Sequence, residues 1–575
     1  MSTDRLSVAG VLEQIAGFLE LRGENPFRVR AFRNAAKAVL GLPGSVAEAL
    51  ADGSLATTRG IGPATLAIIT ELLGSGRSGY LEELRQEVPA GLLDLMGVPG
   101  LGATRVRLLH QRLGIASLDA LEAAARDGSL ARLSGFGEKS AAKLLKGIAF
   151  ARGSRTFRLA PQAAQEAELL RCALERLPGV SRAVVAGEVR RRCEVVGELA
   201  FVILTDLPAA DLLQPLAGLP GLAEVSAPAP DRLTFRAVGG AVASVRLAVA
   251  SQFGAALLRA TGAESHLTLL AAHAEQRGFV LGAGALTRAG AAIPAPDEAA
   301  LYRALGLAEV PPELREGADE VTRAARGTLP RLLERADLAG LIHCHTTYSD
   351  GTLSVADMTA AARDAGYSYI GITDHSKAAA YAGGLDADRV RLQWAEIAAL
   401  NAKAGIPALR GIEADILVDG SLDYDDATLA GFDFVIGSIH SRFSLGAAEM
   451  TARVLRALDC PYLTILGHPT GRLLLSRNAY PLDLEQVFAR AATNGVALEI
   501  NGDPHRLDLD WRLVRRAREV GVMICIGADA HDREGIAYLE FGIAMARKAG
   551  LERQDVLNTR PVGEFLAFAR ARRPR

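Results

Sequence analysis

Two histidines and an aspartate follow a short apolar run in the segment 341–351, which reads LIHCHTTYSDG. Residues i and i+2 of a β-strand face the same way, so the imidazoles of His343 and His345 can reach one metal ion where that strand ends. Asp350 adds a carboxylate five residues later. This spacing is typical of metal ligands, although the two histidines alone also fit polar residues where a strand meets a loop.

Polar side chains also end the other strands predicted after residue 340. Short apolar runs rich in β-branched residues alternate there with amphipathic stretches, which indicates repeated β/α units. Seven such runs end in polar residues, and the carboxyl ends of strands in a parallel barrel converge on one face, where active sites lie. Seven of the chain's ten histidines lie in this region, six of them at these ends. The side chains expected to meet are His343, His345, Asp350, His375, Glu413, His440, His468, Asp529 and His531.

The size of this set points to a cluster of ions. One ion accepts ~4–6 ligands, so nine nitrogen and oxygen ligands predict two or three divalent ions. With no cysteine ligand evident, zinc and manganese are the candidates, and so many imidazoles disfavour magnesium alone. A single histidine at a strand end is more often a hydrogen-bonded structural residue, but that explanation does not account for six histidines together with three carboxylates.

Composition sets limits for the whole chain. At 575 residues it is too long for one hydrophobic core and should divide into several domains. Five scattered cysteines show no CxxC spacing, so we expect neither a disulfide framework nor a zinc knuckle. No apolar run reaches the ~18 residues that span a bilayer and the N-terminus lacks a signal-peptide layout, so we expect a cytoplasmic protein without membrane contact. The net charge of −2 means that any binding of nucleic acid needs local sites.

A repeated turn occurs three times before residue 140. Each copy is an apolar residue between two glycines, followed by a segment of helical character. The apolar residue can plug into a core, while the glycines allow a tight turn whose N–H groups and helix dipole suit a phosphate. One such turn is usually only a connector, but three at similar positions favour phosphate binding. The glycines are Gly60 and Gly62, Gly100 and Gly102, and Gly135 and Gly137.

These turns resemble helix-hairpin-helix motifs, which grip DNA backbones without reading sequence. Upstream, Arg30, Arg33 and Lys37 lie at helical spacing and would form one basic face, either for phosphates or simply for solvent. The whole region 5–150 resembles the 5′-phosphate-binding domain and fingers of family X DNA polymerases. Lyase-active relatives carry a nucleophilic lysine eight residues past the first hairpin glycine, where this chain has Ile68. A Schiff base needs an amine, so we do not expect lyase activity by that route.

The segment 186–204 resembles the palm of the same polymerases, but its metal-binding carboxylates differ. The family pattern has Gly-Ser-x-x-Arg-Arg, two aspartates on the next strand and a third on a neighbouring strand, which together hold two magnesium ions. The two arginines are present, as Arg190 and Arg191. Glu188 stands at the position of the serine. Glu198 and Ala200 stand at the positions of the first two aspartates, and Arg246 aligns with the third. We therefore expect nucleotidyl transfer to be absent or very weak and magnesium binding at the palm to be impaired.

The region after residue 339 closely resembles the PHP (polymerase and histidinol phosphatase) superfamily of metal-dependent phosphoesterases, and all nine ligand positions of that family are occupied. The resemblance implies phosphoester hydrolysis, in which neighbouring ions polarise the phosphoryl oxygens and activate a water. It also implies three ion sites. These are His343, His345, Glu413 and Asp529 for the first ion, Glu413, His440 and His468 for the second, and Asp350, His375 and His531 for the third.

Other residues near the predicted strand ends have less certain parts in this scheme. Arg472 follows His468 and is predicted to be catalytic together with His343, His345, Glu413 and Asp529. Arg472, Arg506 and Asp503 are candidates to hold the phosphate, although surface salt bridges explain the arginines equally well. Many relatives carry an aspartate two residues before the first histidine, and that aspartate supports the metal ligands. This chain has Leu341 at that position.

The resemblances together imply a multidomain fold class. It combines an N-terminal α-helical helix-hairpin-helix region, an α+β palm and thumb of the polymerase-beta-like nucleotidyltransferase type, and a C-terminal distorted β/α (TIM-like) barrel. The predicted parts are an 8-kDa-like DNA-binding domain at 1–85, fingers at 86–152, palm at 153–255, thumb at 256–318, a linker at 319–338 and the PHP domain at 339–575.

The leading hypothesis is a DNA repair enzyme that acts on DNA 3′ ends as a metal-dependent 3′-5′ exonuclease or phosphoesterase. Its polymerase-like part would bind gapped, nicked or 3′-recessed DNA, and the protein would be a monomer. The first alternative is an active gap-filling polymerase with the PHP domain as proofreading nuclease. The others are a non-catalytic DNA-binding scaffold, which an intact ligand set disfavours, and a small-molecule phosphatase, which the three hairpins disfavour.

Overall fold

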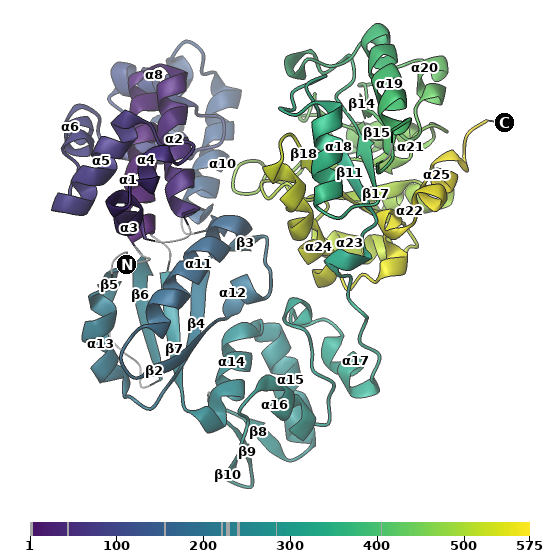
Figure 1. Cartoon of the computed structure of the whole chain (residues 1–575). Coiled ribbons are helices and arrows are strands. Elements are labelled where there is room, and N and C mark those ends of the chain that lie inside the picture. The colour runs from purple at the N-terminus through teal and green to yellow at the C-terminus, as the bar shows by residue number, and fades with distance from the viewer. Residues whose placement is uncertain are drawn as a thin grey trace. The chain divides into compact units, whose positions relative to one another are not determined.

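The computed structural model describes residues 4–42, 45–154, 157–219, 222–225, 231–237, 242–282, 284–403 and 405–574. The chain divides into two compact units, unit 1 (Met1–Val321) and unit 2 (Thr322–Arg575), both drawn in Figure 1. Each unit has hydrophobic cores of its own. No helix of the described residues is long and apolar enough to cross a membrane.

The N-terminal part of unit 1 is entirely helical in its described residues and is built around one apolar core. Its elements are α1 (Asp4–Arg22), α2 (Pro26–Leu40), α3 (Val46–Ala51), α4 (Ser54–Thr57), α5 (Pro63–Ser75), α6 (Gly79–Glu87), α7 (Gly91–Met96), α8 (Ala103–Leu113), α9 (Leu118–Arg126), η1 (Leu130–Arg132) and α10 (Glu138–Ser154).

Each of the three glycine turns forms the same hairpin. The first glycine has a positive φ, a backbone region that glycine adopts without strain. The apolar residue after it is buried, and its N–H donates to the carbonyl oxygen three residues earlier. The second glycine then precedes the next helix, which confirms the predicted plug-and-turn arrangement. The φ values are 97° at Gly60, 89° at Gly100 and 90° at Gly135, and the buried residues are Ile61, Leu101 and Phe136.

A five-stranded sheet follows, with strands in the order β2-β4-β7-β6-β5. Its elements are β1 (Arg158–Leu159), α11 (Ala160–Glu175), β2 (Val180–Val185), α12 (Gly187–Arg190), β3 (Val195–Val196), β4 (Glu198–Thr205), α13 (Ala209–Ala217), β5 (Leu222–Val225), β6 (Arg232–Ala237) and β7 (Val242–Ala248). The central strands β4 and β7 run parallel, while the other pairs are antiparallel. Because successive strand residues face opposite sides, Leu199 and Phe201 pack towards α11 and α13, while Ala200 and Val202 pack on the other face.

The last part of unit 1 joins helices to a small three-stranded antiparallel sheet. Its elements are η2 (Ala250–Gln252), α14 (Phe253–Thr261), α15 (Glu264–Gln276), β8 (Phe279–Leu281), β9 (Leu286–Arg288), β10 (Ala291–Ile293), α16 (Glu298–Ala304) and η3 (Pro312–Leu314). A buried ion-pair network holds these elements together. Glu298 accepts hydrogen bonds from Arg190, at 2.9 Å from its Nη1, and from the fully buried Arg315.

Replacing Glu298 by alanine should destabilise this part of unit 1 by ~3–5 kcal/mol, because two guanidinium groups would lose their buried counter-charge. Burial opposes ionisation of the carboxyl, but Arg190 and Arg315 lower its pKa below the ordinary value. The stabilisation is therefore present above that ordinary pKa and is lost as pH falls through the lowered one. Hydrogen exchange of the amides in α14 and α16 measures the effect. The exposed Glu275→Ala variant is the control, and equal protection in both variants would contradict the expectation.

Unit 2 is a curled eight-stranded parallel sheet in the order β13-β12-β11-β18-β17-β16-β15-β14. This agrees with the predicted distorted barrel, and Figure 1 shows helices around the strands. The strands are β11 (Gly340–Cys344), β12 (Tyr369–Ile372), β13 (Ala408–Arg410), β14 (Glu413–Asp415), β15 (Ile436–Ser438), β16 (Ile465–Leu466), β17 (Ala497–Asn501) and β18 (Ile524–Ala530). The helices are α17 (Glu320–Arg326), which begins in unit 1, and α18 (Val355–Asp364), α19 (Ala387–Asn401), α20 (Asp426–Gly431), α21 (Ala447–Leu458), α22 (Leu484–Asn494), α23 (Trp511–Glu519), α24 (Leu539–Lys548) and α25 (Val562–Arg570). The 3-10 turns are η4 (Arg335–Asp337), η5 (Ala380–Ala382), η6 (Glu534–Tyr538), η7 (Arg553–Asp555) and η8 (Leu557–Thr559).

One of the seven strands predicted after residue 340 is two strands in the structure. The run that begins at Ala408 stops at Arg410, and β14 starts at Glu413. Gly411 lies at the break, where an added β-carbon would be 2.6 Å from the carbonyl oxygen of Ile372 and from the ring of Phe434. The backbone is thus closely packed at this bend, and Glu413 begins a strand although we predicted that it follows one.

Candidate metal centre

The polar strand ends of unit 2 come together in the structure. His343 lies in β11 and His345 follows that strand, while Asp529 lies in β18, which pairs with β11. His343, Asp529 and His468 all have a positive φ, of 66°, 52° and 25°. Non-glycine residues in such conformations cost ~1–3 kcal/mol each and concentrate at functional sites. The backbone therefore carries strain at three of the predicted ligands.

Glu413 is the hub of this cluster. It is 1% exposed, and five imidazoles approach its carboxylate. From Oε1 the distances are 2.9 Å to Nε2 of His468, 3.3 Å to Nε2 of His440 and 3.5 Å to Nε2 of His343, and from Oε2 they are 2.9 Å to Nδ1 of His375 and 3.7 Å to Nε2 of His345.

Two aspartates flank this hub. Oδ1 of Asp529 lies 3.3 Å from Nε2 of His345 and 3.6 Å from Nε2 of His343. Asp350 lies 3.3 Å from Nε2 of His531 through Oδ1 and 3.6 Å from Nε2 of His375 through Oδ2. The nine predicted ligands are thus brought into one connected cluster of side chains.

The candidate ligand atoms fall into three groups, and within each group they lie within 4.8 Å of one another. The groups are His343, His345 and Asp529; His375, Glu413 and His440; and His345, Asp350, His375 and His531. They differ from the sets implied by the resemblance in three ways, the first of which is that Glu413 is not grouped with His343, His345 and Asp529. His345 and His375 each belong to two groups, and His468 contacts Glu413 without joining any of the three.

The donor atoms fit divalent ions. Nε2 of His343, both ring nitrogens of His345 and Oε2 of Glu413 are buried and make no hydrogen bond to any described residue. A buried polar atom left without a partner costs ~1–3 kcal/mol, so ions that bind these atoms would remove that cost. Imidazole and carboxylate together suit zinc or manganese.

Opposite charges in the cluster hold its carboxylates ionised. Burial opposes ionisation, but the neighbouring imidazoles hold the pKa of Glu413 and of Asp529 well below the ordinary values. Burial likewise disfavours the charged imidazolium, but Glu413 and then Asp350 raise the pKa of His375 to about 10. His345 is different, because burial and the charge of His375 lower its pKa. A metal binds the neutral imidazole, so this shift favours metal binding.

A second layer of polar side chains orients these ligands. Glu499 accepts hydrogen bonds from Nδ1 of His343 and, at 2.7 Å, from the backbone N–H of His468. Asp415 accepts one from Nδ1 of His440 at 2.7 Å. Contacts of this kind fix the orientation and tautomer of a ligand imidazole. Sequence reasoning missed Glu499, although a glutamate inside the apolar run 496–500 was a signal that could have found it.

Replacing Glu499 by glutamine should weaken metal binding ~10- to 100-fold, because His343 would lose the acceptor that fixes its ring. The substitution keeps the size of the side chain. Titration of the metal-free protein with zinc against a coloured chelator measures the affinity. The exposed Glu485→Gln variant of α22 is the matched control, and equal zinc affinities in the two variants would refute this role for Glu499.

The two arginines predicted near the phosphate have different surroundings. Arg472 donates to the carbonyl oxygens of Arg506 and Leu507 and pairs with Asp510 at 2.6 Å, so its guanidinium is committed to the 506–510 loop. Nε of Arg506 instead lies 3.4 Å from Oδ2 of Asp529 and makes no hydrogen bond within the described chain. These contacts favour Arg506 as the cation beside the cluster. Arg472 instead holds the 506–510 loop, which carries Arg506. Asp503 accepts hydrogen bonds from His505.

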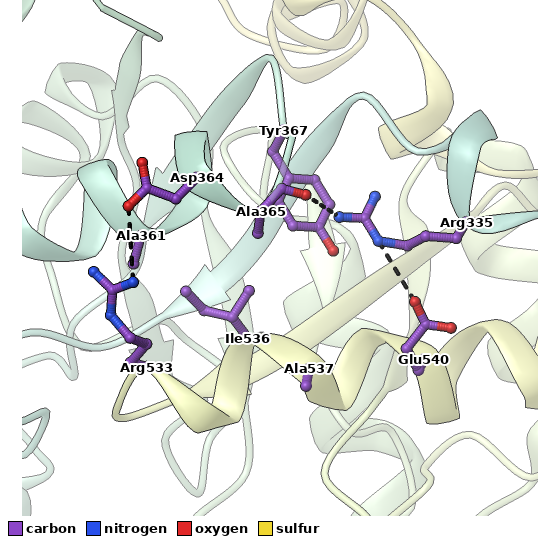
Figure 2. Close-up of a pocket in the computed structure, with 9 residues that line it drawn as sticks. All are labelled: Arg335, Ala361, Asp364, Ala365, Tyr367, Arg533, Ile536, Ala537 and Glu540. Atoms are coloured by element: carbon purple, nitrogen blue, oxygen red, sulfur yellow. Dashed lines mark hydrogen bonds and ion pairs between the residues drawn. The ribbon is translucent and has the colours of Figure 1, made fainter.

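A hollow between α18 and the start of α24 lies apart from these ligands (Figure 2). Two ion pairs belong to its lining, Arg335 with Glu540 at 3.5 Å and Arg533 with Asp364 at 3.7 Å. The guanidinium of Arg335 also lies 3.9 Å from the centroid of the Tyr367 ring. None of the nine candidate ligands lines this hollow, and its charges are paired with one another. We therefore assign the chemistry to the histidine cluster.

Comparisons with known proteins cover both units. A PHP domain matches residues 342–502, a helix-hairpin-helix domain 4–78, a SAM-like helix-hairpin-helix tandem 92–149 and a DNA polymerase beta thumb 256–316. The chain is 36% identical to DNA polymerase/3′-5′ exonuclease PolX of Bacillus subtilis over 567 residues, which covers 97% of this chain and 98% of that protein. The chain belongs to the bacterial family X DNA polymerases with a C-terminal PHP domain. A PHP domain is a metal-dependent hydrolase domain, and the three groups of the histidine cluster could hold metal ions.

The PHP part of this family X polymerase is also similar to proteins named probable phosphatases. One from Thermoanaerobacter sp. (strain X514) is 28% identical over 179 residues, which covers 29% of this chain and 70% of that protein. Another, from Vibrio parahaemolyticus, is 33% identical over 173 residues, which covers 28% of this chain and 66% of that protein.

In the palm of this family X polymerase, the strand register shows which residues replace the three aspartates. Ala200 on β4 lies opposite Ser244 on β7, two residues before Arg246. Ser244 donates a hydrogen bond to Glu198, whose carboxylate also pairs with Arg232 at 2.7 Å. Carboxylates that share ions must be neighbours, so the third aspartate position is Ser244, and our alignment to Arg246 was two residues too late.

The other palm residues have protein partners as well. Arg246 forms an ion pair with Asp231. Glu188, which stands where the family has serine, accepts hydrogen bonds from the backbone N–H groups of Gly197 at 2.6 Å and Glu198 at 3.3 Å. Glu198 is thus the single carboxylate at the three aspartate positions, and a serine and an arginine already bind it.

The predicted basic face of the family X N-terminal region is only partly available. Arg33 pairs with Glu20 at 2.5 Å, which favours a structural role. Arg30 and Lys37 are exposed on α2. The guanidinium of Arg30 lies 4.6 Å from the centroid of the Phe27 ring, and Phe27 is 72% exposed. Arg30 and Lys37 are therefore better placed than Arg33 to reach a phosphate.

Proposed function

We propose that this protein is a DNA repair exonuclease that removes nucleotides from DNA 3′ ends in its PHP domain. The observation that carries the proposal is the buried cluster around Glu413, where ligand atoms of His343 and His345 lack hydrogen-bond partners among the described residues. The name of the Bacillus subtilis relative includes a 3′-5′ exonuclease, and the three hairpins supply turns suited to DNA phosphates. The protein would act as a monomer in the cytoplasm, and its substrates would be gapped, nicked or 3′-recessed DNA. Its domains would have the boundaries that the sequence predicts.

The nine predicted residues would hold two or three ions, manganese or zinc. The first ion would be held by His343, His345, Glu413 and Asp529. The second would be held by Glu413 and His440, together with His375 or His468. The third would be held by Asp350 and His531, together with His345 or His375. Ions there would supply the Lewis acidity that hydrolysis of a phosphodiester needs.

The protein's own residues contribute orientation and charge. Glu499 and Asp415 fix the rings of His343 and His440 through their Nδ1 atoms. Arg506, at 3.4 Å from Asp529, is placed to bind a phosphate oxygen at the edge of the cluster by a charge-assisted hydrogen bond.

We further infer that the palm binds DNA without transferring nucleotides. Two-ion nucleotidyl transfer needs several carboxylates in one place. This palm has only Glu198 at the three aspartate positions, bound to Ser244 and Arg232. Membership of the polymerase family favours the second candidate, an active gap-filling polymerase with the PHP domain as proofreader.

One experiment separates these functions. The purified protein is incubated with labelled single-stranded, 3′-recessed and gapped DNA, with manganese, zinc or a chelator, and with or without deoxynucleotides. We expect 3′ shortening with metal, none with chelator and no extension. Templated extension that Glu198→Ala abolishes would establish the polymerase, whereas DNA binding with neither reaction would leave a scaffold.

A further inference from the structure

Tyr381 stands beside the metal-ligand cluster with its side chain largely in solvent. It is 73% exposed, although its ring centroid lies only 6.2 Å from that of His375 and 6.5 Å from that of His440. Exposed apolar surface next to a reactive site marks a place where a ligand binds. The ring is therefore placed where a ligand of the cluster could contact its face.

The loop that carries this ring is fixed at both ends. The N–H of Ser376 donates to the carbonyl oxygen of Glu413 at 3.1 Å, and the N–H of Leu385 donates to that of His375 at 2.8 Å. Gly384 packs so closely that an added β-carbon would lie 1.9 Å from the carbonyl oxygen of Ser376. The ring is thus held out at the mouth by a loop anchored to the ligand-bearing strands.

Arg389 of α19 fastens the same loop from its other side. Its Nη1 donates to the carbonyl oxygens of Gly383, at 2.6 Å, and Gly384, at 3.3 Å. A surface that is fixed before binding loses little conformational freedom when a ligand arrives. This anchoring is expected for a binding platform.

Further exposed apolar side chains of unit 2 occur close to this loop in the sequence. The large ones among its described residues all lie in the stretch 381–418. Tyr381 follows β12, whereas Leu417 and Val418 follow β14, and the bridge between His375 and Glu413 joins the ends of those two strands. We call Tyr381, Leu392, Leu417 and Val418 the apolar rim.

We propose that Tyr381 stacks on the base of the 3′-terminal nucleotide and so positions the last phosphodiester over the cluster. The proposal rests on the exonuclease function proposed above. Every base has a π-face, so an aromatic platform accepts any sequence, and an unpaired terminal base can reach it without the cost of breaking a base pair. The Tyr381 ring therefore favours single-stranded or frayed 3′ ends over fully paired ones.

The test compares wild type with Tyr381→Ala, Tyr381→Leu and Tyr381→Phe on two labelled single strands, one of which lacks its 3′-terminal base. Loss of stacking should raise KM on the intact strand about 5- to 150-fold, or ~1–3 kcal/mol, in the alanine and leucine variants, with kcat little changed. Tyr381→Phe keeps the ring and should behave as wild type. On the strand without the terminal base, all four proteins should have similar KM values.

Three outcomes would overturn the inference. An equal loss on both strands would mean general damage to the site, and an unchanged KM for Tyr381→Ala would mean that the ring makes no contact. Full activity of Tyr381→Leu would show that an apolar contact suffices without stacking. If wild type shortens neither strand, the proposed exonuclease fails and the inference fails with it, whereas the three outcomes above leave the exonuclease intact.

Discussion

Replacement of Glu413 by glutamine is expected to lower the 3′-5′ exonuclease rate about a thousandfold, since polarising contacts of a metal centre are worth several kcal/mol and ~1.4 kcal/mol is a factor of ten. Five imidazoles lie around this carboxylate. An amide removes the negative charge they share and turns N–H protons towards ring nitrogens that would otherwise bind metal. Bound metal, measured by mass spectrometry of the purified protein, should fall together with the rate.

The control for this variant is Glu564→Gln, an exposed position of α25. Affinity for gapped DNA should be the same in both variants, because the hairpins of unit 1 are unchanged. A Glu413→Gln protein that keeps both its metal and its nuclease activity would place the reaction outside the cluster.

Removal of the metal ions should stop the nuclease and also lower the melting temperature of unit 2. The cluster contains buried polar atoms without hydrogen bonds to described residues, such as Nε2 of His343 and both ring nitrogens of His345. An ion that binds only the folded state at a thousand times its Kd stabilises that state by ~4 kcal/mol. Calorimetry before and after chelation, with manganese or zinc added back, measures the shift.

A His343→Ala variant supplies the comparison, since it lacks a ligand of the first ion site and its melting temperature should fall less on chelation than that of wild type. Chelation that leaves the melting of wild-type unit 2 unchanged would contradict a structural contribution from the ions. Loss of activity without a change in melting would mean that the ions are bound only with substrate.

Local sequence predicted the candidate site well because its signals are short-range. His343 and His345 share a strand face through the i, i+2 rule, and Asp350 follows on the same segment. The three hairpins were also predictable, since Gly60 and its two counterparts need a positive φ that glycine adopts most easily. In each case the residues are close in sequence, so the local backbone conformation nearly determines how far apart their side chains lie.

Contacts between distant segments could not be predicted in the same way. Glu499 reaches His343 across 156 residues, and no spacing rule connects them. The placement of Ser244 beside Ala200 depends on how β4 pairs with β7, and a shift of two residues keeps the same face and gives an equally reasonable alignment. The hydrogen bonds of Arg472 to the 506–510 loop are a third such contact, and the spacing of these segments along the chain did not predict it.

The sequence by itself determined the residue types that meet at the barrel mouth, the three glycine turns and the loss of aspartates from the palm. Tertiary structure alone decided that Glu413 lies at the centre of five imidazoles, that His345 and His375 each belong to two ligand groups, and that Tyr381 stands exposed beside them. The reason is physical. Strand and helix periodicity fixes the direction of a side chain relative to its own backbone, whereas its distance to another strand depends on packing and register across the whole barrel.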